Sequence, residues 1–264
     1  MIRRNNIYFV SDLHLGAPDH GSSLIREKHF VDWLKTIESQ TTELYLLGDI
    51  FDFWYEYKYA IPKGFVRVLG QLATMADNGV LIHIFTGNHD LWYRDYLVKE
   101  IGAKVYSEPV IREIYGKKFY LAHGDGLGPG DAGYKWMKKV FTSRVNQWLF
   151  TRLHPDYGIG LARFFSSLSR NHNYGDTQGK EVFHHGNKEY LYIHAHEILK
   201  QMPDIQVFVF GHRHILIRDE IAPGSELVML GDWIQYFSFL EVSETGLHLD
   251  IFPLFQHQIL PQYE

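Results

Sequence analysis

The sequence predicts a layered α/β fold with a helical block inserted between two of its strands. Short apolar runs that end in polar, often glycine-containing turns recur along the chain, and each has the length of a buried strand. In the first half of the chain, helical stretches alternate with these runs, as is typical of layered α/β folds. From Asp131 to about Met202, mainly helical sequence interrupts the alternation.

Each element of this prediction rests on a short stretch of sequence. The expected strands are the runs IYFVSD, LYLLGD, LIHIFTGNHD, KFYLAHGD, VFVFGHRH and LVMLGDW. Helices are expected near Ser23 to Ser39, Gly64 to Asn78 and Leu91 to Ile101. Two hairpins, turning at Gly116-Lys117 and Thr245-Gly246, predict a mixed sheet with an antiparallel portion toward the C-terminus.

The helical block is predicted to be a cap on a single domain of residues 1–264, and not a domain of its own. Met137, Phe141, Val145 and Trp148 recur at spacings of four, four and three residues, which predicts one amphipathic helix. Between Tyr134 and Arg170 there are seven basic residues and one acidic residue. This imbalance indicates a surface that meets an anionic partner.

The composition excludes several classes of protein. The absence of cysteine excludes disulfides and thiolate metal sites, and it fits a reducing compartment. A formal net charge of −5 disfavours general nucleic-acid binding. No apolar run approaches the ~18 residues that a membrane-spanning helix needs, and the N-terminus lacks the features of a signal peptide. We therefore expect a cytoplasmic protein.

Polar clusters follow five of the predicted strands. Since strand ends in α/β sheets aim side chains from distant segments at one point, these clusters predict a shared site. Their carboxylates, imidazoles and single amide suit Mn²⁺, Fe²⁺ or Zn²⁺ better than Ca²⁺. The clusters are Asp12-Leu13-His14, Gly48-Asp49 with Asp52, Gly87-Asn88-His89-Asp90, His123-Gly124-Asp125 and Gly211-His212-Arg213-His214.

The spacing of the paired ligands and the glycines beside them also support a metal site. The pleat of a strand would place both side chains of the D-x-H and H-x-H pairs on one side, and the glycines would allow a sharp turn and the approach of a phosphate. One such cluster is weak evidence, because an isolated buried histidine is usually a hydrogen-bonded core residue. Five clusters in this order are improbable by chance.

The ordered set resembles the calcineurin-like metallophosphoesterases, and the resemblance extends from Asp12 to His214. It implies a layered α/β/β/α sandwich with a helical cap insertion and two divalent metal ions. One ion would be held by Asp12, His14, Asp49 and His214. The other would be held by Asp49, Asn88, His123 and His212, so that Asp49 bridges the two.

A metal pair predicts hydrolysis of a phosphoester. Two cations roughly 3.5–4 Å apart lower the pKa of a water between them and neutralise charge developing on phosphorus. His89 is not needed as a ligand and can donate to a phosphate oxygen or protonate the leaving group. Asp52 either orients His89 or caps a strand end. Asp90 is expected to cap the helix that follows it.

A closer resemblance is to the UDP-2,3-diacylglucosamine pyrophosphatases of lipid A synthesis. It rests on SDLHLG, LLGDIFDFW, HGDGLGPGDAGY and LGDW, of which Gly130 to Tyr134 is the most specific. The resemblance implies a lipid-linked nucleotide-sugar substrate that is cleaved to UMP and 2,3-diacylglucosamine 1-phosphate, with Mn²⁺ as the expected cofactor. It also implies a cap that cradles acyl chains and peripheral contact with the inner face of the inner membrane. The implied substrate contacts are Asn88, His89, Asp131, Ser169, Asn173, Lys180 and His212.

The sequence departs from this closer family at two positions. Many members have Arg at the position of His89 and Glu at the position of Asp52. The alternative is therefore a relative that acts on another nucleotide or phospholipid diester. The long insertion argues against a protein phosphatase, and a non-catalytic scaffold would be expected to have lost ligands. The oligomeric state is left open. The remaining histidines (His184, His185, His194 and His196) are read as surface or cap residues, with a patch that has affinity for metal ions as the alternative.

Overall fold

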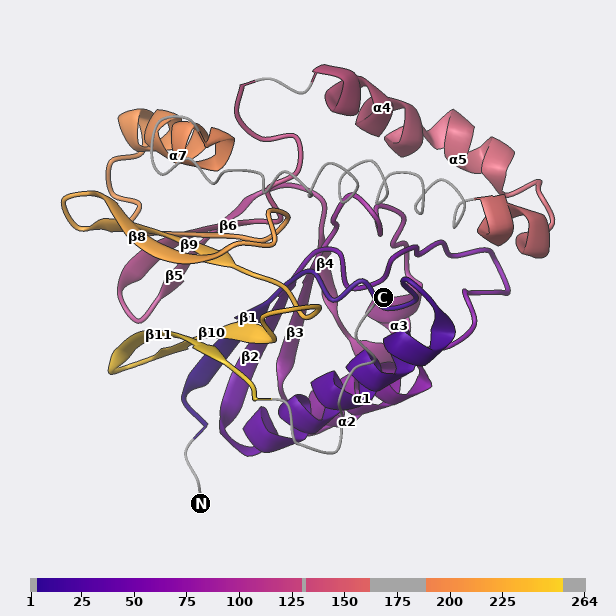
Figure 1. Cartoon of the computed structure of the whole chain (residues 1–264), viewed down its shortest axis with the longest axis horizontal. Helices are drawn as coiled ribbons and strands as arrows, with labels where there is room; N and C mark the ends of the chain where they lie inside the picture. Colours follow the sequence, from indigo (N-terminus) through magenta and orange to yellow (C-terminus); the bar gives the residue numbers. More distant parts are fainter. Residues whose placement is uncertain (1–3, 130–131, 162–188, 254–264) are drawn as a thin grey trace.

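The computed structural model describes residues 4–129, 132–161 and 189–253 (Figure 1). Two sheets face each other, with helices outside each of them, so the core is an α/β/β/α sandwich. This confirms the predicted fold class. Among the described residues, no helix is both long and apolar enough to cross a membrane.

The first sheet has six strands and is covered by α1 (His20–Ile37), α2 (Val66–Asp77) and α3 (Tyr96–Ile101). Four strands run parallel, and the C-terminal hairpin adds antiparallel to β1. A short 3₁₀ turn (Glu38–Gln40) joins α1 to β2. In order across the sheet, the strands are β11 (Gly246–Ile251), β10 (Ser238–Ser243), β1 (Asn6–Val10), β2 (Thr41–Leu47), β3 (Leu81–Phe85) and β4 (Lys104–Tyr106).

The second sheet has five strands and is covered by α7 (Tyr190–Gln201). Strands β6, β7 and β9 run parallel, and an antiparallel strand lies at each edge. Both predicted hairpins, β5–β6 and β10–β11, are present. In order, the strands are β5 (Val110–Ile114), β6 (Lys117–Ala122), β7 (Val207–Phe210), β9 (Ser225–Leu230) and β8 (Leu216–Ala222).

The central strands are apolar over the later part of their length because both of their faces are buried there. In β1, Tyr8 and Val10 pack toward the helices, whereas Ile7 and Phe9 pack between the sheets. Successive side chains of a strand point to opposite faces, so a strand covered on both sides reads as a continuous apolar run. The strand ends are thereby held in a rigid frame.

The insertion begins with two short helices in place of the single predicted one. These are α4 (Ala132–Thr142) and α5 (Arg144–Phe150), separated at Ser143, whose ψ of 124° is extended. The Thr142 hydroxyl donates a hydrogen bond to the Lys138 carbonyl, and the Asn146 side chain donates one to the Val140 carbonyl. Side chains therefore bond to carbonyl groups in the last turn of α4. Polar side chains that bond to nearby backbone compete with helix continuation, which accounts for the break.

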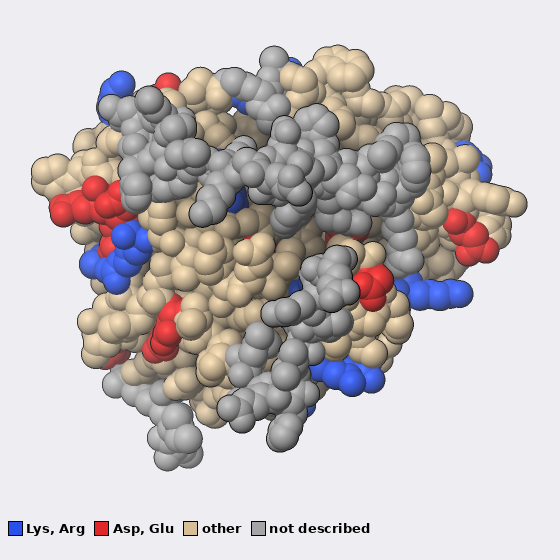
Figure 2. All heavy atoms as spheres, viewed as in Figure 1, with Lys and Arg blue, Asp and Glu red and all other residues tan. Residues whose placement is uncertain are grey.

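Two other predicted helix boundaries differ from the structure. α1 begins at His20 because the Asp19 carboxylate accepts from the Ser22 backbone N–H at 3.0 Å and serves as the N-cap. α3 begins at Tyr96 and not near Leu91, because Trp92 forms a β-bridge with Tyr55. On the face shown in Figure 2, described Lys and Arg side chains are interspersed with Asp and Glu and form no continuous basic patch.

Candidate metal centre and catalytic residues

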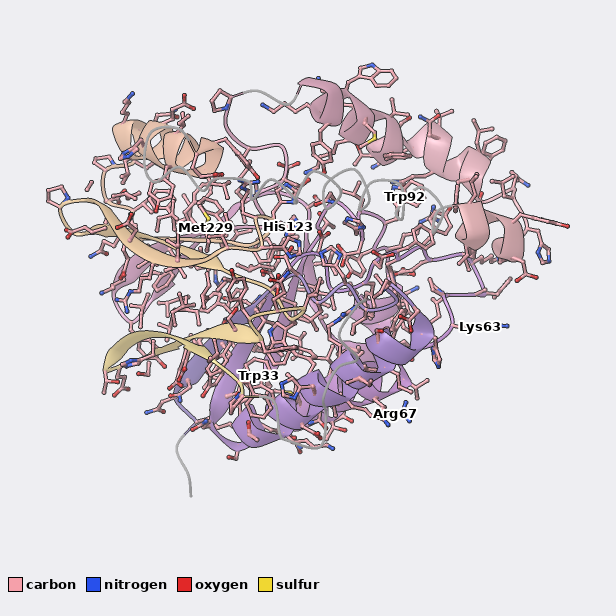
Figure 3. The ribbon with its side chains drawn as sticks, viewed as in Figure 1. Trp33, Lys63, Arg67, Trp92, His123 and Met229 are labelled. Carbon is pink, nitrogen blue, oxygen red and sulfur yellow. The ribbon has the colours of Figure 1, made fainter. Side chains whose placement is uncertain are left out.

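The predicted polar clusters lie in loops that follow strands of both sheets. Asp12 follows β1, Asp49 follows β2 and Asn88 follows β3 in the first sheet, while His123 follows β6 and His212 follows β7 in the second. The strands run parallel within each sheet, so their carboxyl ends meet at a common edge. His123 accordingly lies near the middle of the molecule (Figure 3).

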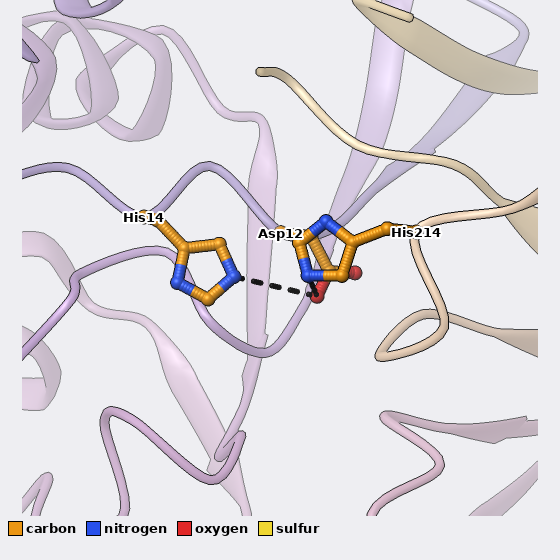
Figure 4. A group of neighbouring side chains, drawn as sticks. All are labelled: Asp12, His14 and His214. Carbon is orange, nitrogen blue, oxygen red and sulfur yellow. Dashed lines mark ion pairs between the residues drawn. The ribbon is translucent and has the colours of Figure 1, made fainter. Parts of the chain in front are cut away.

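One group of metal-competent side chains consists of Asp12, His14 and His214 (Figure 4). Asp12 Oδ1 lies 3.8 Å from His14 Nε2 and 3.5 Å from His214 Nε2. The other ring nitrogen of His214, Nδ1, lies 3.0 Å from Asp232 Oδ2. A carboxylate behind a metal-binding histidine orients the ring and raises its basicity. Asp232 is not among the predicted site residues, although it lies in the LGDW motif.

A second group consists of Asp49, His123 and His212. His123 Nδ1 is 2.7 Å from the Leu47 carbonyl oxygen, which directs Nε2 toward the site. That Nε2 lies 3.4 Å from Asp49 Oδ2 and 3.3 Å from Asn88 Oδ1, so the amide oxygen faces the same space.

Asp49 lies between the two groups. Its Oδ2 is 3.6 Å from His14 Nε2 and 3.4 Å from His123 Nε2. Its Oδ1 accepts a hydrogen bond from the His89 backbone N–H at 2.9 Å. One carboxylate thus touches ligands of both groups, which is the arrangement that a bridging ligand requires.

His89 and Asp52 lie together at the edge of the centre. His89 Nδ1 is 3.2 Å from the Asp52 carbonyl oxygen and 3.6 Å from its carboxylate Oδ1. The His89 ring meets the His14 ring edge-on, with centroids 4.8 Å apart. His14, Asp49 and His89 also form a third group close enough to hold an ion. The structure therefore places the predicted acid–base residue against the predicted ligands.

The predicted strand pleat is not what gathers the ligands. Asp12, His14, Asp49, His212 and His214 all lie beyond the ends of their strands, with φ between 44° and 66°. Residues other than glycine rarely adopt this left-handed backbone conformation. Each one lowers the stability of the fold by an amount of order 1–3 kcal/mol. The expectation that alternating strand geometry aligns the side chains of D-x-H and H-x-H was therefore wrong. Loops with strained backbone conformations bring these side chains together.

The cluster glycines are required by the ligands beside them. A Cβ at Gly87 would lie 2.2 Å from Asp49 Oδ1, and one at Gly48 would lie 2.5 Å from His123 Nδ1. At Gly211 it would lie 2.6 Å from Asp12 Oδ2. Glycine therefore allows these three loops to approach the neighbouring ligand side chains closely.

Asp90 has a different role from the predicted helix cap. Its buried carboxylate accepts from the backbone N–H groups of Asp49, Ile50, Phe51 and Gly87 and from the Tyr93 hydroxyl. The cap of α3 is instead at Asp95. Burial, reinforced by the charge of Asp49, raises the pKa of Asp90 to about 6. Asp90 thus holds together the loops that carry Asp49 and Asn88.

The donor set fits divalent cations. Asp12 Oδ1 and both ring nitrogens of His14 are buried without a hydrogen-bond partner among the described residues. Burial alone would raise the pKa of Asp12, but the positive charge of His214 holds it at about 2. Burial would lower the pKa of His123, but the charge of Asp49 raises it to about 10. The buried carboxylates therefore attract positive charge, which bound cations would supply.

The remaining predicted contacts divide into two sets. Asn88, His89 and His212 lie at the centre described above, with Asn88 and His89 partly exposed. Asp131, Ser169, Asn173, Lys180, His184 and His185 lie outside the described residues. His194 in α7 is half-buried, with Nε2 3.0 Å from the Tyr120 hydroxyl.

Comparison with known proteins identifies the family. The sequence profile described as calcineurin-like phosphoesterase matches residues 6–216. The chain belongs to this family. It is a metal-dependent hydrolase of phosphoric esters, as its ligand set predicted.

Curated relatives match over nearly the whole chain. A protein of Porphyromonas gingivalis named UDP-2,3-diacylglucosamine hydrolase is 37% identical over 94% of this chain and 97% of its own length. A protein of Haemophilus influenzae with the same name is 28% identical over 90% of this chain and 95% of its own. The solved structure of a phosphoesterase from E. coli aligns with 92% of this chain and 90% of its own at 13% identity, with a TM-score of 0.44.

Proposed function

We propose that the chain hydrolyses the pyrophosphate bond of UDP-2,3-diacylglucosamine to UMP and 2,3-diacylglucosamine 1-phosphate, a step of lipid A biosynthesis. The observation that carries this proposal is the pair of ligand groups that share Asp49, in a chain whose curated relatives bear the name of that hydrolase.

The metal ligands in this proposal are those implied by the family resemblance. Asp12, His14, Asp49 and His214 would hold one ion, and Asp49, Asn88, His123 and His212 would hold the other. When bound, two cations lower the pKa of water and neutralise the negative charge that develops on the phosphoryl oxygens. We expect Mn²⁺, with Fe²⁺ or Zn²⁺ as alternatives that the same ligands accept.

His89 is assigned to proton transfer in this proposal. The Asp52 carbonyl oxygen at 3.2 Å and its carboxylate at 3.6 Å favour the tautomer protonated on Nδ1 and orient the ring. We assign donation to a phosphate oxygen, or protonation of the leaving group, to Nε2. Asn88 and His212, on neighbouring loops, would contact the same phosphate.

The insertion is assigned to the lipid part of the substrate. Its described helices expose aromatic side chains beside basic ones, with Trp136 69% and Trp148 54% exposed and Arg152 lying over the Trp148 ring. Amphipathic helices of this kind bind at the surface of anionic membranes. We propose peripheral contact with the cytoplasmic face of the inner membrane. Asp131, Ser169, Asn173 and Lys180 remain the predicted substrate contacts outside the described residues.

A second candidate substrate class is another nucleotide or phospholipid diester. His89 and Asp52 favour it, because the closer family resembled by this chain has Arg and Glu at these positions in many members. Such an enzyme would retain the same metal centre. It would differ only in the group that the insertion accepts.

Product analysis separates the two candidates. The protein would be incubated with UDP-2,3-diacylglucosamine and Mn²⁺, with bis(p-nitrophenyl) phosphate as a parallel substrate. We expect UMP and 2,3-diacylglucosamine 1-phosphate in equal amounts, and loss of both on addition of EDTA. Hydrolysis of the simple diester alone would retain the phosphoesterase assignment and overturn the lipid substrate.

A further inference from the structure

The start of the insertion is tied to the loop that carries His123. Asp125, two residues after this ligand, accepts hydrogen bonds from the Tyr134 hydroxyl and from Lys138 Nζ of α4, the latter at 2.7 Å. Lys135 of the same helix donates to the Gly128 carbonyl. The first helix of the insertion is therefore bonded directly to a metal-ligand loop.

The residues that lead into α7 are tied to the loop that carries His212 and His214. The sequence placed α7 inside the insertion, but this helix packs against the second sheet, so we take the insertion to end before it. Arg213 stands between these ligands, and its Nη2 donates to Glu189 Oε2 at 3.0 Å. Its Nε lies 3.0 Å from Glu189 Oε1, within ion-pair distance. Glu189 is the N-cap residue of α7, the first described helix after residue 161.

The two tied ends also touch each other. A Cβ at Gly128 would lie 2.6 Å from the Tyr190 carbonyl oxygen, and one at Gly124 would lie 3.4 Å from the Leu191 side chain. The beginning of α7 thus lies against the loop that leads into α4. The insertion is attached at adjacent points on the rim of the metal centre.

Burial makes these ion pairs strong attachments. Asp125 and Glu189 are each only 5% exposed. Removing the partner of a buried carboxylate leaves an uncompensated charge, whereas most exposed pairs contribute little. α5 has no fully buried residue, so the insertion lacks a packed core of its own at this helix.

We propose that Lys138 and Glu189 are positioning residues that clamp the two ends of the insertion onto the metal-ligand loops. The clamp sets where the cap holds the lipid part of the substrate relative to the reacting phosphate. This role rests on the proposed function, because a simple diester has no lipid part for the cap to hold.

The test breaks the clamp from the insertion side, away from the metal ligands. Lys138→Met and Glu189→Gln would be compared with Lys139→Met and Glu197→Gln, which change exposed residues of the same two helices. The value of kcat/KM would be measured for UDP-2,3-diacylglucosamine and for bis(p-nitrophenyl) phosphate with Mn²⁺. Hydrogen exchange would be followed across α4 and α7.

We expect kcat/KM for the lipid substrate to fall roughly 10-fold in each clamp variant. The value for the simple diester should change less than about twofold, because misplacement of the cap affects only a substrate that the cap holds. Lys138→Arg should retain the lipid activity. Exchange across α4 should rise in Lys138→Met and not in Lys139→Met. Equal losses for both substrates, or activities unchanged in both clamp variants, would overturn the clamp.

The same data separate the clamp from the proposed function. If the unmodified protein does not hydrolyse UDP-2,3-diacylglucosamine, the proposed function fails and hydrogen exchange alone decides whether Lys138 and Glu189 hold the insertion. Unchanged exchange in both variants then refutes the clamp. If the unmodified protein hydrolyses the lipid substrate but the variants match their controls, the function stands and the clamp fails.

Discussion

The metal-ligand loops and the inserted helices are built by opposite means. Asp12, Asp49 and His14 are at most 4% exposed, and their loops are held by strained backbone and close glycine contacts. In the insertion, Trp136 and Trp148 are more than half exposed and α5 buries no residue completely. The difference indicates that packing fixes the metal-ligand loops and constrains the inserted helices much less.

Holding metal ions and holding a substrate place different demands on a protein. A two-metal centre needs ligand positions set to within tenths of an ångström, which only a packed frame can provide. The group attached to phosphorus varies between substrates, and a region attached at a few points can change without disturbing the ligands.

Asp49→Ala should remove both metal ions, because this carboxylate touches ligands of both groups. Metal ions contribute several kcal/mol to transition-state stabilisation, so we expect turnover of either substrate to fall by roughly 1,000-fold or more. Metal content and kcat would be measured together. Asp250→Ala, which changes an exposed acid in β11, is the control. Retention of two ions in Asp49→Ala contradicts the bridging role.

His89→Ala should retain the metal ions and lower kcat by about 10²–10⁴-fold, the range expected for loss of a general acid. The effect should appear with both substrates, since proton transfer belongs to the core and not to the insertion. Metal content again provides the check. Loss of an ion with turnover preserved would instead assign His89 to the third ligand group.

Gly87→Ala should weaken metal binding about 10- to 100-fold, which is the usual effect of disturbing the residues that support metal ligands. The added methyl would lie 2.2 Å from Asp49 Oδ1, so the loop must shift. Gly70→Ala is the matched control, because a Cβ there meets nothing within 4 Å in α2. It should raise the free energy of unfolding by about 0.5–1 kcal/mol with metal affinity unchanged. Equal metal affinities in the two variants would refute the packing argument.

Joint replacement of Trp136 and Trp148 by Ala should lower binding to anionic phospholipid vesicles roughly 10-fold, because less apolar surface enters the interface. Hydrolysis of bis(p-nitrophenyl) phosphate should not change. Tyr59→Ala is the control, since Tyr59 is 88% exposed but lies outside the insertion. Vesicle binding that falls equally in the control would place the membrane contact elsewhere.

The ligands were predictable from sequence because they recur in order at strand ends. Five polar clusters following apolar runs need no long-range information to be noticed, and the structure gathers Asp12, His14, Asp49, His123 and His212 as that pattern indicates. The layered fold was predictable for the same reason, since strands buried on both faces read as continuous apolar runs.

The rest depends on contacts between distant residues. The Asp90 carboxylate accepts hydrogen bonds from the backbone of residues 49–51, some 40 positions away in the sequence. The Asp232 carboxylate contacts His214 Nδ1 only because the fold brings the two residues together. Neither partner can be read from local spacing. The left-handed backbone at Asp12 and His14 and the break at Ser143 are likewise decided by which groups lie nearby. Sequence periodicity carries none of this information.

Anomalous diffraction from crystals grown with Mn²⁺ would show whether two metal ions share Asp49. We expect two peaks per chain, one beside Asp12, His14 and His214 and one beside Asn88, His123 and His212, with the Asp49 carboxylate between them. A single peak among His14, Asp49 and His89, or none within reach of Asp49, would contradict this expectation.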